Sequence, residues 1–209
     1  MNQIVEAPIS GQPLIITQVS QNCLKTYQLP FHFDPRALQA DLAQLANENW
    51  VAHFNRHYYE GAWSGVALRA TDGLANRLFN NPNQRNFADT PALERCPNLQ
   101  AVLANFHCPL TSVRLLKLAA GAAIREHSDP DLHHEYGEVR LHIPLLTNPQ
   151  VEFFLAGERI VMNEGECWYL NLSLPHRVFN RGATDRIHLV VDCLVNDWLQ
   201  TIIPFAAID

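Results

Sequence analysis

The 209-residue sequence has neither a long hydrophobic run nor a basic leader. No stretch approaches the roughly 18 uninterrupted apolar residues that a membrane span needs. The opening residues, MNQIVEAPISGQPLIITQVS, contain neither a basic start nor a compact apolar run, so the sequence predicts no secretory signal. We therefore expect a cytoplasmic protein with no membrane partner.

Cysteine pairs and basic clusters are also absent. The 15 Lys and Arg residues are scattered, and the net charge is -6, so we expect no nucleic-acid partner. Nothing in the sequence indicates an oligomeric state. The cysteines have no CxxC pair, which predicts buried small apolar groups in a reducing compartment rather than a disulfide framework or zinc knuckle. They are Cys23, Cys96, Cys108, Cys167 and Cys193.

The hydrophobic share of 47% and charged share of 17% indicate a single globular domain. Residues 1–111 are predicted to be strands and helices packed on a barrel within that domain. Two β-like runs, PLIITQVS and CLKTYQLPF, precede a helix over DPRALQADLAQLANEN, with Asp34 as N-cap and Pro35 at its first position. A β-like stretch over 50–70, a long surface loop over 73–98 and a short helix over PNLQAVLANF follow.

From Ser112 onward, short runs rich in branched and aromatic residues alternate with turn residues. This texture predicts a mainly β fold, a jelly-roll, cupin-like barrel with flanking N-terminal helices. Residues 112–195 are its predicted core and 196–209 a C-terminal tail. The runs are SVRLLKLAAG, AIREHSD, EVRLHIPLLTN, VEFFLAG, ERIVMNEG, ECWYLNLS, HRVFNRGATD and RIHLVVDCLV.

The stretch REHSDPDLHH, residues 125–134, is rich in metal-binding side chains. In an extended strand His127 and Asp129 project to one face, and Glu126 points away. Pro130 ends the strand, since it cannot donate to a sheet ladder. The loop beyond, in which contact with substrate and simple solvation are both open, contains Asp131, His133 and His134.

A third ligand must come from elsewhere, and His176 is distinctive because it follows a proline at the start of a strand pattern. Two histidines and one carboxylate form the facial triad typical of non-haem iron(II). The HxD spacing alone arises often by chance. Arg186 lies in an apolar run on the next strand, where its guanidinium needs an anion. That anion is either a ligand carboxylate or a structural partner from among Asp185, Asp192 and Glu138.

Several motifs in order resemble the aspartyl/asparaginyl β-hydroxylase family, including its bacterial proline hydroxylase-like members. They are HSD, RLHIPLLTN, FFLAGERIVMNEGECWYLN, PHRVFNRG and RIHLVVD, which together cover roughly residues 112–195. The family's enzymes are iron(II)- and 2-oxoglutarate-dependent oxygenases on a double-stranded β-helix. The resemblance therefore implies that fold, with Fe(2+), 2-oxoglutarate and O2 as cofactors.

Carried over residue by residue, the resemblance makes His127, Asp129 and His176 the iron ligands. It assigns Arg186 to the distal carboxylate of 2-oxoglutarate. Arg140 and His142, in RLHIPL, match a pair that contacts cosubstrate or substrate carboxylate. The implied reaction is hydroxylation of an unactivated C–H bond, with succinate and carbon dioxide as coproducts. Leu116 stands where the vertebrate members have a serine near the cosubstrate.

Two other hypotheses stay open: a cupin-like zinc or manganese isomerase or hydrolase, and a non-catalytic module that binds 2-oxoglutarate. The expected substrate is an amino-acid, peptidyl or carrier-bound group with a carboxylate. Arg125 shares the predicted face of His127, so it either contacts that carboxylate or lies at the solvated rim. The remaining histidines are not expected to be ligands: His188 as a core residue, and His32, His53, His57 and His107 outside the barrel pattern.

Overall fold

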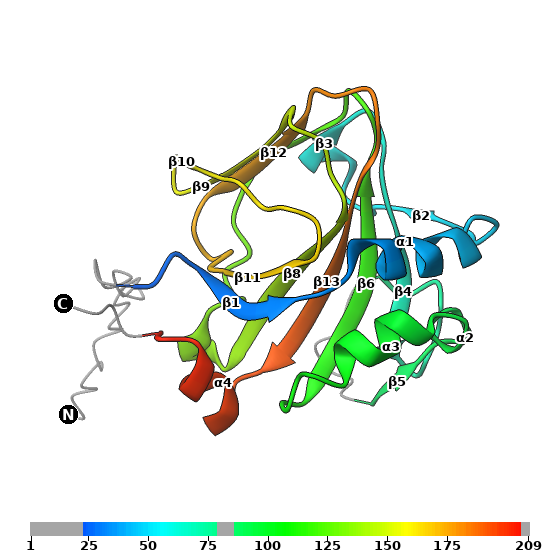
Figure 1. Cartoon of the computed structure of the whole chain (residues 1–209). Helices are drawn as coiled ribbons and strands as arrows, with labels where there is room; N and C mark the ends of the chain where they lie inside the picture. The colour runs from blue at the N-terminus through cyan, green and yellow to red at the C-terminus, as the bar shows by residue number, and fades with distance from the viewer. Residues whose placement is uncertain (1–22, 79–85, 206–209) are drawn as a thin grey trace, which may run out of the picture.

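The computed structural model describes residues 23–78 and 86–205. Two antiparallel sheets face each other and enclose the interior of the molecule (Figure 1). The larger sheet has the order β1-β11-β8-β13-β6-β4-β2, with β5 paired to β4, and the smaller has the order β10-β9-β12-β7-β3. The predicted strand PLIITQVS lies outside the described residues.

The strands of the larger sheet are β1 Thr26–His32, β2 Val51–Ala52, β4 Trp63–Thr71, β5 Phe87–Asp89, β6 Leu110–Leu118, β8 Glu138–Leu146, β11 Glu166–Leu170 and β13 Arg186–Leu194. Those of the smaller sheet are β3 Tyr59–Glu60, β7 Ala123–His127, β9 Val151–Leu155, β10 Glu158–Ile160 and β12 His176–Asn180. Each predicted β run from Ser112 onward overlaps one of these strands. The mainly β, cupin-like fold is thus confirmed.

Helices cover the outer face of the larger sheet (Figure 1). They are α1 Pro35–Gln44, α2 Pro91–Glu94, α3 Pro97–Leu103 and α4 Asp197–Ile202, with 3-10 turns at η1 Arg56–Tyr58 and η2 His134–Tyr136. The predicted N-cap of α1 is confirmed, because Asp34 Oδ1 accepts a hydrogen bond from the Arg36 backbone N–H at 2.9 Å. Leu38 and Leu45 then bury their side chains against the sheet together with Leu99 of α3.

Two expectations about connecting segments were incomplete. The loop predicted over 73–98 contains β5 and α2, which Thr90 attaches to β4: its hydroxyl donates to the Ala67 carbonyl at 2.7 Å and its N–H to that of Leu68 at 2.9 Å. The prolines that suggested a loop begin α2 and α3 instead. The predicted C-terminal tail contains α4, where Asn196 Oδ1 accepts from the Leu199 N–H at 3.1 Å.

The central strands are buried on both faces, and their side chains alternate between two environments. On β13, Leu189 and Val191 pack with the helices, whereas Val190 belongs to the apolar cluster between the sheets. Arg186, His188 and Asp192 have the same parity as Val190, and all three are buried. The inward face of this strand is therefore largely polar, unlike its outward face.

Over the described ranges, no helix is both long enough and apolar enough to cross a membrane.

Candidate metal centre

Three predicted ligands come together where two neighbouring inner strands of the smaller sheet meet end to start. His127 ends β7 and His176 begins β12, and the two residues are direct partners in the antiparallel register. Asp129 lies beyond the end of β7, where its backbone N–H donates to the Leu172 carbonyl at 2.8 Å. One ligand atom from each of the three side chains lies within 4.8 Å of the others. This spacing suits a single metal ion bound by all three.

Backbone carbonyls fix the proton on each imidazole. His127 Nδ1 lies 2.8 Å from the Arg125 carbonyl oxygen, and His176 Nδ1 lies 3.0 Å from that of Leu174. A carbonyl can only accept, so each Nδ1 donates and each Nε2 keeps a lone pair for a metal. Burial, with a smaller contribution from His127, lowers the pKa of His176 to about 4. His176 is therefore a neutral imidazole at neutral pH.

Arg140 connects the predicted ligand Asp129 to a buried carboxylate. Its Nη1 donates to Asp129 Oδ2 at 3.0 Å, and its Nε and Nη2 donate to the two oxygens of Asp192 at 2.6 and 3.0 Å. Asp192 also accepts from Arg114 Nη2 at 2.8 Å. Burial tends to raise the pKa of Asp192, but Arg114 and Arg140 lower it to about 2. This ion-pair chain holds the Asp129 carboxylate in one orientation.

Arg186 is 3% exposed and meets none of its three predicted structural partners. Its Nη2 lies 2.9 Å from His188 Nδ1, and its Nε has no partner. In the part of the chain that the structure describes, no carboxylate lies within the 4.0 Å ion-pair distance of Arg186. Burial lowers the pKa of Arg186 to about 9. A buried guanidinium in this condition favours an anionic ligand.

The three structural partners considered for Arg186 are engaged elsewhere. Asp192 pairs with Arg114 and Arg140. Asp185 Oδ1 accepts from the Ala120 N–H at 3.2 Å, and Glu138 Oε1 accepts from the Thr111 hydroxyl at 2.6 Å. The hypothesis of a structural pair is therefore wrong.

His142 lies on the inward face of β8 with both ring nitrogens buried and unpartnered. Burial lowers the pKa of His142 well below its ordinary value, and the Arg186 charge lowers it further. His142 is thus a neutral imidazole able to donate or accept one hydrogen bond beside Arg186. His188, predicted as a core histidine, is 1% exposed and contacts the Arg186 guanidinium.

Two cavities meet at the predicted ligands. The inner one, of about 50 Å³, is lined by the six predicted site residues His127, Asp129, His176, Arg140, His142 and Arg186, with Trp63, Leu116, Ile124, Phe153, Leu172 and Val178. The outer one, of about 290 Å³, shares His127, Asp129, Arg140, Trp63 and Leu116 and adds His53, Phe54, Tyr58, Arg114, Pro130, Asp131 and Leu132. The five shared residues lie between the small inner cavity and the larger outer cavity.

Sequence reasoning missed several residues of the outer cavity, including His53 and Arg114. His53 stacks on Trp63 with ring centroids 3.6 Å apart, although its position before the barrel gave no reason to expect it there. Arg114 interrupts the apolar run SVRLLKL as Arg186 interrupts its own strand, so the same signal could have identified it.

Asp131 lines the outer cavity, whereas Arg125 turns outward to Glu60 at 3.0 Å and to the His57 carbonyl at 3.1 Å. Arg125 therefore does not line either cavity.

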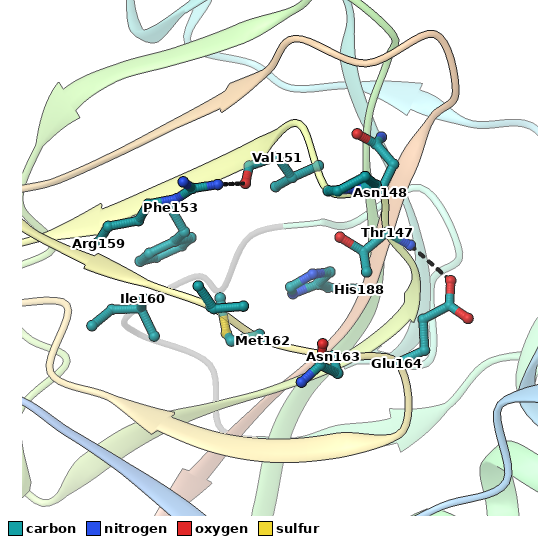
Figure 2. A pocket seen from close by; sticks show the side chains of 12 residues that line it. Thr147, Asn148, Val151, Phe153, Arg159, Ile160, Met162, Asn163, Glu164 and His188 are labelled. Atoms are coloured by element: carbon teal, nitrogen blue, oxygen red, sulfur yellow. Dashed lines mark hydrogen bonds between the residues drawn. The ribbon is translucent and has the colours of Figure 1, made fainter.

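A separate cavity of about 500 Å³ is lined by His188 (Figure 2). His188 and Phe153 point into it, and Met162 and Ile160 add apolar surface. The Thr147 N–H donates to Glu164 Oε1 at 3.0 Å at its margin. None of the three predicted metal ligands lines this cavity.

Comparison with known proteins identifies the family of this chain. The family described as Aspartyl/Asparaginyl beta-hydroxylase matches residues 33–195. The "L-proline cis-4-hydroxylase" of Rhizobium meliloti (strain 1021) is 29% identical over 165 residues, which cover 77% of this chain and 57% of that protein. The chain thus spans little more than half the length of this relative.

Solved structures share the fold. An oxidoreductase of the 2OG-Fe(II) oxygenase family from Burkholderia pseudomallei matches with a TM-score of 0.53 and 16% identity, over 80% of this chain and 85% of that one. The non-haem α-ketoglutarate-dependent epimerase SnoN from nogalamycin biosynthesis matches with a TM-score of 0.53 and 13% identity, over 81% and 78%. Because the family match covers most of the sequence, this chain belongs to the aspartyl/asparaginyl β-hydroxylase family.

Proposed function

We propose that this protein is an iron(II)- and 2-oxoglutarate-dependent dioxygenase that hydroxylates an unactivated C–H bond of a carboxylate-bearing amino-acid, peptidyl or carrier-bound substrate. The observation that carries the proposal is the cluster of His127, Asp129 and His176 beside Arg186, a buried cation with no carboxylate partner among the described residues. The relative named as an L-proline hydroxylase supports a free amino acid as the first substrate to test.

The donor set fits iron(II). Two imidazole Nε2 atoms and one carboxylate oxygen would hold the metal and leave other coordination positions for small molecules. Arg186 would bind the distal carboxylate of 2-oxoglutarate through its planar fork, with neutral His142 available for a hydrogen bond to the cosubstrate or the substrate. Bound together, iron(II) and 2-oxoglutarate supply an oxidant from O2 and yield succinate and carbon dioxide.

The chain's own residues orient the reactants and exclude water. Arg140 holds one oxygen of Asp129, which leaves the other free to face a metal. Trp63, Leu116 and Phe153 give the inner cavity an apolar wall. Such a wall protects a reactive oxidant from side reactions with solvent.

The outer cavity suits an anionic substrate. Arg114 and Arg140 both line it, while Asp192, which neutralises part of their charge, does not. When Asp129 binds a metal, its negative charge is shared with that ion, so the two arginines and the metal face Asp131 as the other carboxylate that lines this cavity. We therefore assign the outer cavity to the substrate and its carboxylate to Arg114 and Arg140.

The alternative of a zinc or manganese isomerase or hydrolase leaves Arg186 without a role. A non-catalytic module explains Arg186 but leaves unexplained a cluster of metal-binding side chains that opens directly into a second, larger cavity.

All five cysteines are free in the structure, which supports our placement of the protein in a reducing compartment such as the cytoplasm.

The proposal is tested by turnover with iron(II), ascorbate and 2-oxoglutarate against free amino acids, peptides and carrier-bound aminoacyl groups. We expect release of succinate and a substrate that gains one oxygen atom. Under anaerobic conditions, iron(II) and 2-oxoglutarate should give a weak visible charge-transfer band. Both signals should disappear in His176→Ala.

Arg177→Ala is the matched control, because Arg177 adjoins His176 but pairs on the surface with Glu126. It should keep both the band and the turnover. A folded wild-type protein with no band and no succinate release for any of the substrates would refute the proposed function.

A further inference from the structure

A second cluster of metal-binding side chains lies apart from the candidate iron site. Cys23 precedes β1, and His133 and His134 lie in the segment between β7 and β8. One ligand atom from each of the three lies within 4.8 Å of the others. His133 is 3% exposed, and Cys23 and His134 are half-buried. Residues from two distant parts of the chain thus converge on one point.

The donor atoms at this point are sulfur and nitrogen. Cys23 Sγ lies 2.8 Å from His133 Nε2. His134 Nδ1 is buried and has no hydrogen-bond partner. Ligands of a tetrahedral zinc ion, with Zn–S of about 2.3 Å and Zn–N of about 2.0 Å, lie on the order of 3.5 Å from one another. The cluster is therefore compact enough to hold such an ion after small side-chain shifts.

We propose that Cys23, His133 and His134 bind a zinc ion, with a solvent molecule completing the coordination. A thiolate with two imidazoles favours zinc, whereas the carboxylate-containing set at His127 favours iron(II). The two sites therefore differ in the chemistry of their ligands as well as in their place in the fold.

The surroundings of Cys23 suit a metal-bound thiolate. Asn171, which is fully buried, donates from Nδ2 to Cys23 Sγ at 3.1 Å. Tyr169 is fully buried, and its hydroxyl has no hydrogen-bond partner. Burial raises the pKa of this phenol, and the Cys23 sulfur raises it further. Asn171 Nδ2 thus already donates to this sulfur, and the Tyr169 hydroxyl is left without a partner. Hydrogen-bond donors of this kind around a metal ligand support its binding.

A nucleophilic thiolate–imidazole pair would be the other use of these side chains. Burial raises the pKa of Cys23, and the Glu135 charge adds to this, while the Asn171 hydrogen bond lowers it. A catalytic thiolate needs its pKa lowered instead. A metal ion removes this difficulty, because its binding displaces the thiol proton.

His133 needs its ring proton on Nδ1 if Nε2 is to bind the metal. Two groups from Glu135 face Nδ1: the backbone N–H at 3.3 Å and carboxylate Oε2 at 3.7 Å. The carboxylate is the acceptor that the metal-bound form requires, in the pattern in which a metal-ligating histidine donates its other N–H to a carboxylate. Zinc binding should therefore exchange the backbone contact for the carboxylate contact.

The cluster is joined to the candidate iron site through short paths. Asn171 contacts Cys23, and the next residue, Leu172, accepts the hydrogen bond from the Asp129 N–H. Along the loop, Leu132 lies between Asp129 and His133 and lines the outer cavity. A zinc ion at Cys23 would thus attach the start of β1 to the loop that forms one wall of that cavity.

Cobalt(II) tests the site directly, because a cobalt–thiolate bond gives an intense near-ultraviolet band that histidine and carboxylate ligands do not. Chelator-treated His176→Ala protein, which lacks one ligand of the candidate iron site, should bind one equivalent of Co2+ with this band. Equimolar Zn2+ should remove it. Adding Cys23→Ser should abolish the band and weaken Co2+ binding by at least about 100-fold, the upper range for loss of a supporting partner around a metal.

Cys108→Ser is the matched control, because Cys108 is also half-buried but interacts with Cys193. It should retain the band, and circular dichroism should show every variant folded. The proposal is overturned by a folded His176→Ala protein that shows no thiolate band with Co2+. It is also overturned by a band that survives Cys23→Ser or resists Zn2+. None of these outcomes depends on iron, 2-oxoglutarate or turnover.

Discussion

Asp192 illustrates how single buried charges hold the interior in place. It is 2% exposed and accepts hydrogen bonds from Arg114 and Arg140. Asp192→Asn would leave two buried guanidinium groups without their carboxylate, so we expect a loss of about 3–5 kcal/mol in the free energy of unfolding. Urea denaturation measures this loss. Asp89→Asn, which breaks the exposed pair with Arg69, should cost at most about 1 kcal/mol.

The same carboxylate predicts an acid dependence. Burial would raise the pKa of Asp192, but the two arginines lower it to about 2, below the value of about 3.9 for an unfolded chain. A pKa that is lower in the folded state adds stability above pH 4, and this stability is lost as the pH falls toward 2. The stability difference between wild type and Asp192→Asn should therefore be constant from pH 7 to 5 and shrink below pH 4. A difference that stays unchanged to pH 3 would contradict this assignment.

Individual site residues could be predicted where a residue contradicted its surroundings. His176 after a proline and Arg186 in an apolar strand were both singled out in this way. The pairing of Arg140 with Asp192 could not be predicted, because it depends on the register in which β8 and β13 place them opposite each other. His53 was missed for a related reason: only the pairing of β2 with β4 brings it to Trp63.

At the scale of one element, alternate side chains of β13 either pack in the outer core or line the cavities. Leu189 faces the helices and is fully buried, whereas Arg186 and His188 face the cavities. We expect Leu189→Ala to lower the free energy of unfolding by about 2–5 kcal/mol because it leaves a cavity in the outer core. The affinity of the folded protein for 2-oxoglutarate should stay within about twofold of wild type. Calorimetric titration below the unfolding temperature measures that affinity.

Leu38→Ala on α1 provides a second position on the same outer core, from a different element. It should behave like Leu189→Ala in both measurements. A large loss of 2-oxoglutarate affinity in either folded variant would show that the outer core positions the inward side chains and does not merely stabilise the sheet.

Elements were predictable where turn residues separated short β runs, as they do throughout 112–195. The segment over 73–98 was harder, because the same prolines signal loops and helix starts, and only the contacts of Thr90 with β4 distinguish the two. Strand alternation placed His127 and Asp129 on one face, although β7 ends at His127. The two side chains still converge because the Leu172 carbonyl holds the Asp129 backbone.

Over the whole molecule, the larger sheet divides two kinds of interior. Its outer face is an apolar core built with the helices, and its inner face carries charged and histidine side chains between the sheets. Of these, Arg186 stands out because it lacks a carboxylate partner within the described ranges. Its burial without an anion should make the protein less stable than its packing alone would allow.

Arg186→Met tests that trade-off between stability and binding. The apolar side chain of similar length removes a buried charge, so without ligands the variant should unfold at the same temperature as wild type or higher. For wild type with Mn2+ bound, 2-oxoglutarate at 100 times its dissociation constant should add about 2.7 kcal/mol. That corresponds to a rise of roughly 5–10 °C in Tm for a chain of this length. The variant should keep the rise caused by Mn2+ and lose the rise caused by 2-oxoglutarate.

Arg159→Met is the control for this experiment, because Arg159 lines the separate cavity shown in Figure 2 and donates to the Val151 carbonyl at 3.2 Å. It should keep both increments, since the proposed cosubstrate position is the inner cavity. Loss of the 2-oxoglutarate increment in Arg159→Met, with its retention in Arg186→Met, would move the cosubstrate to the larger cavity. Loss of both increments in Arg186→Met would instead show that this arginine supports the metal ligands, because a residue that only binds the anion cannot change the response to metal alone.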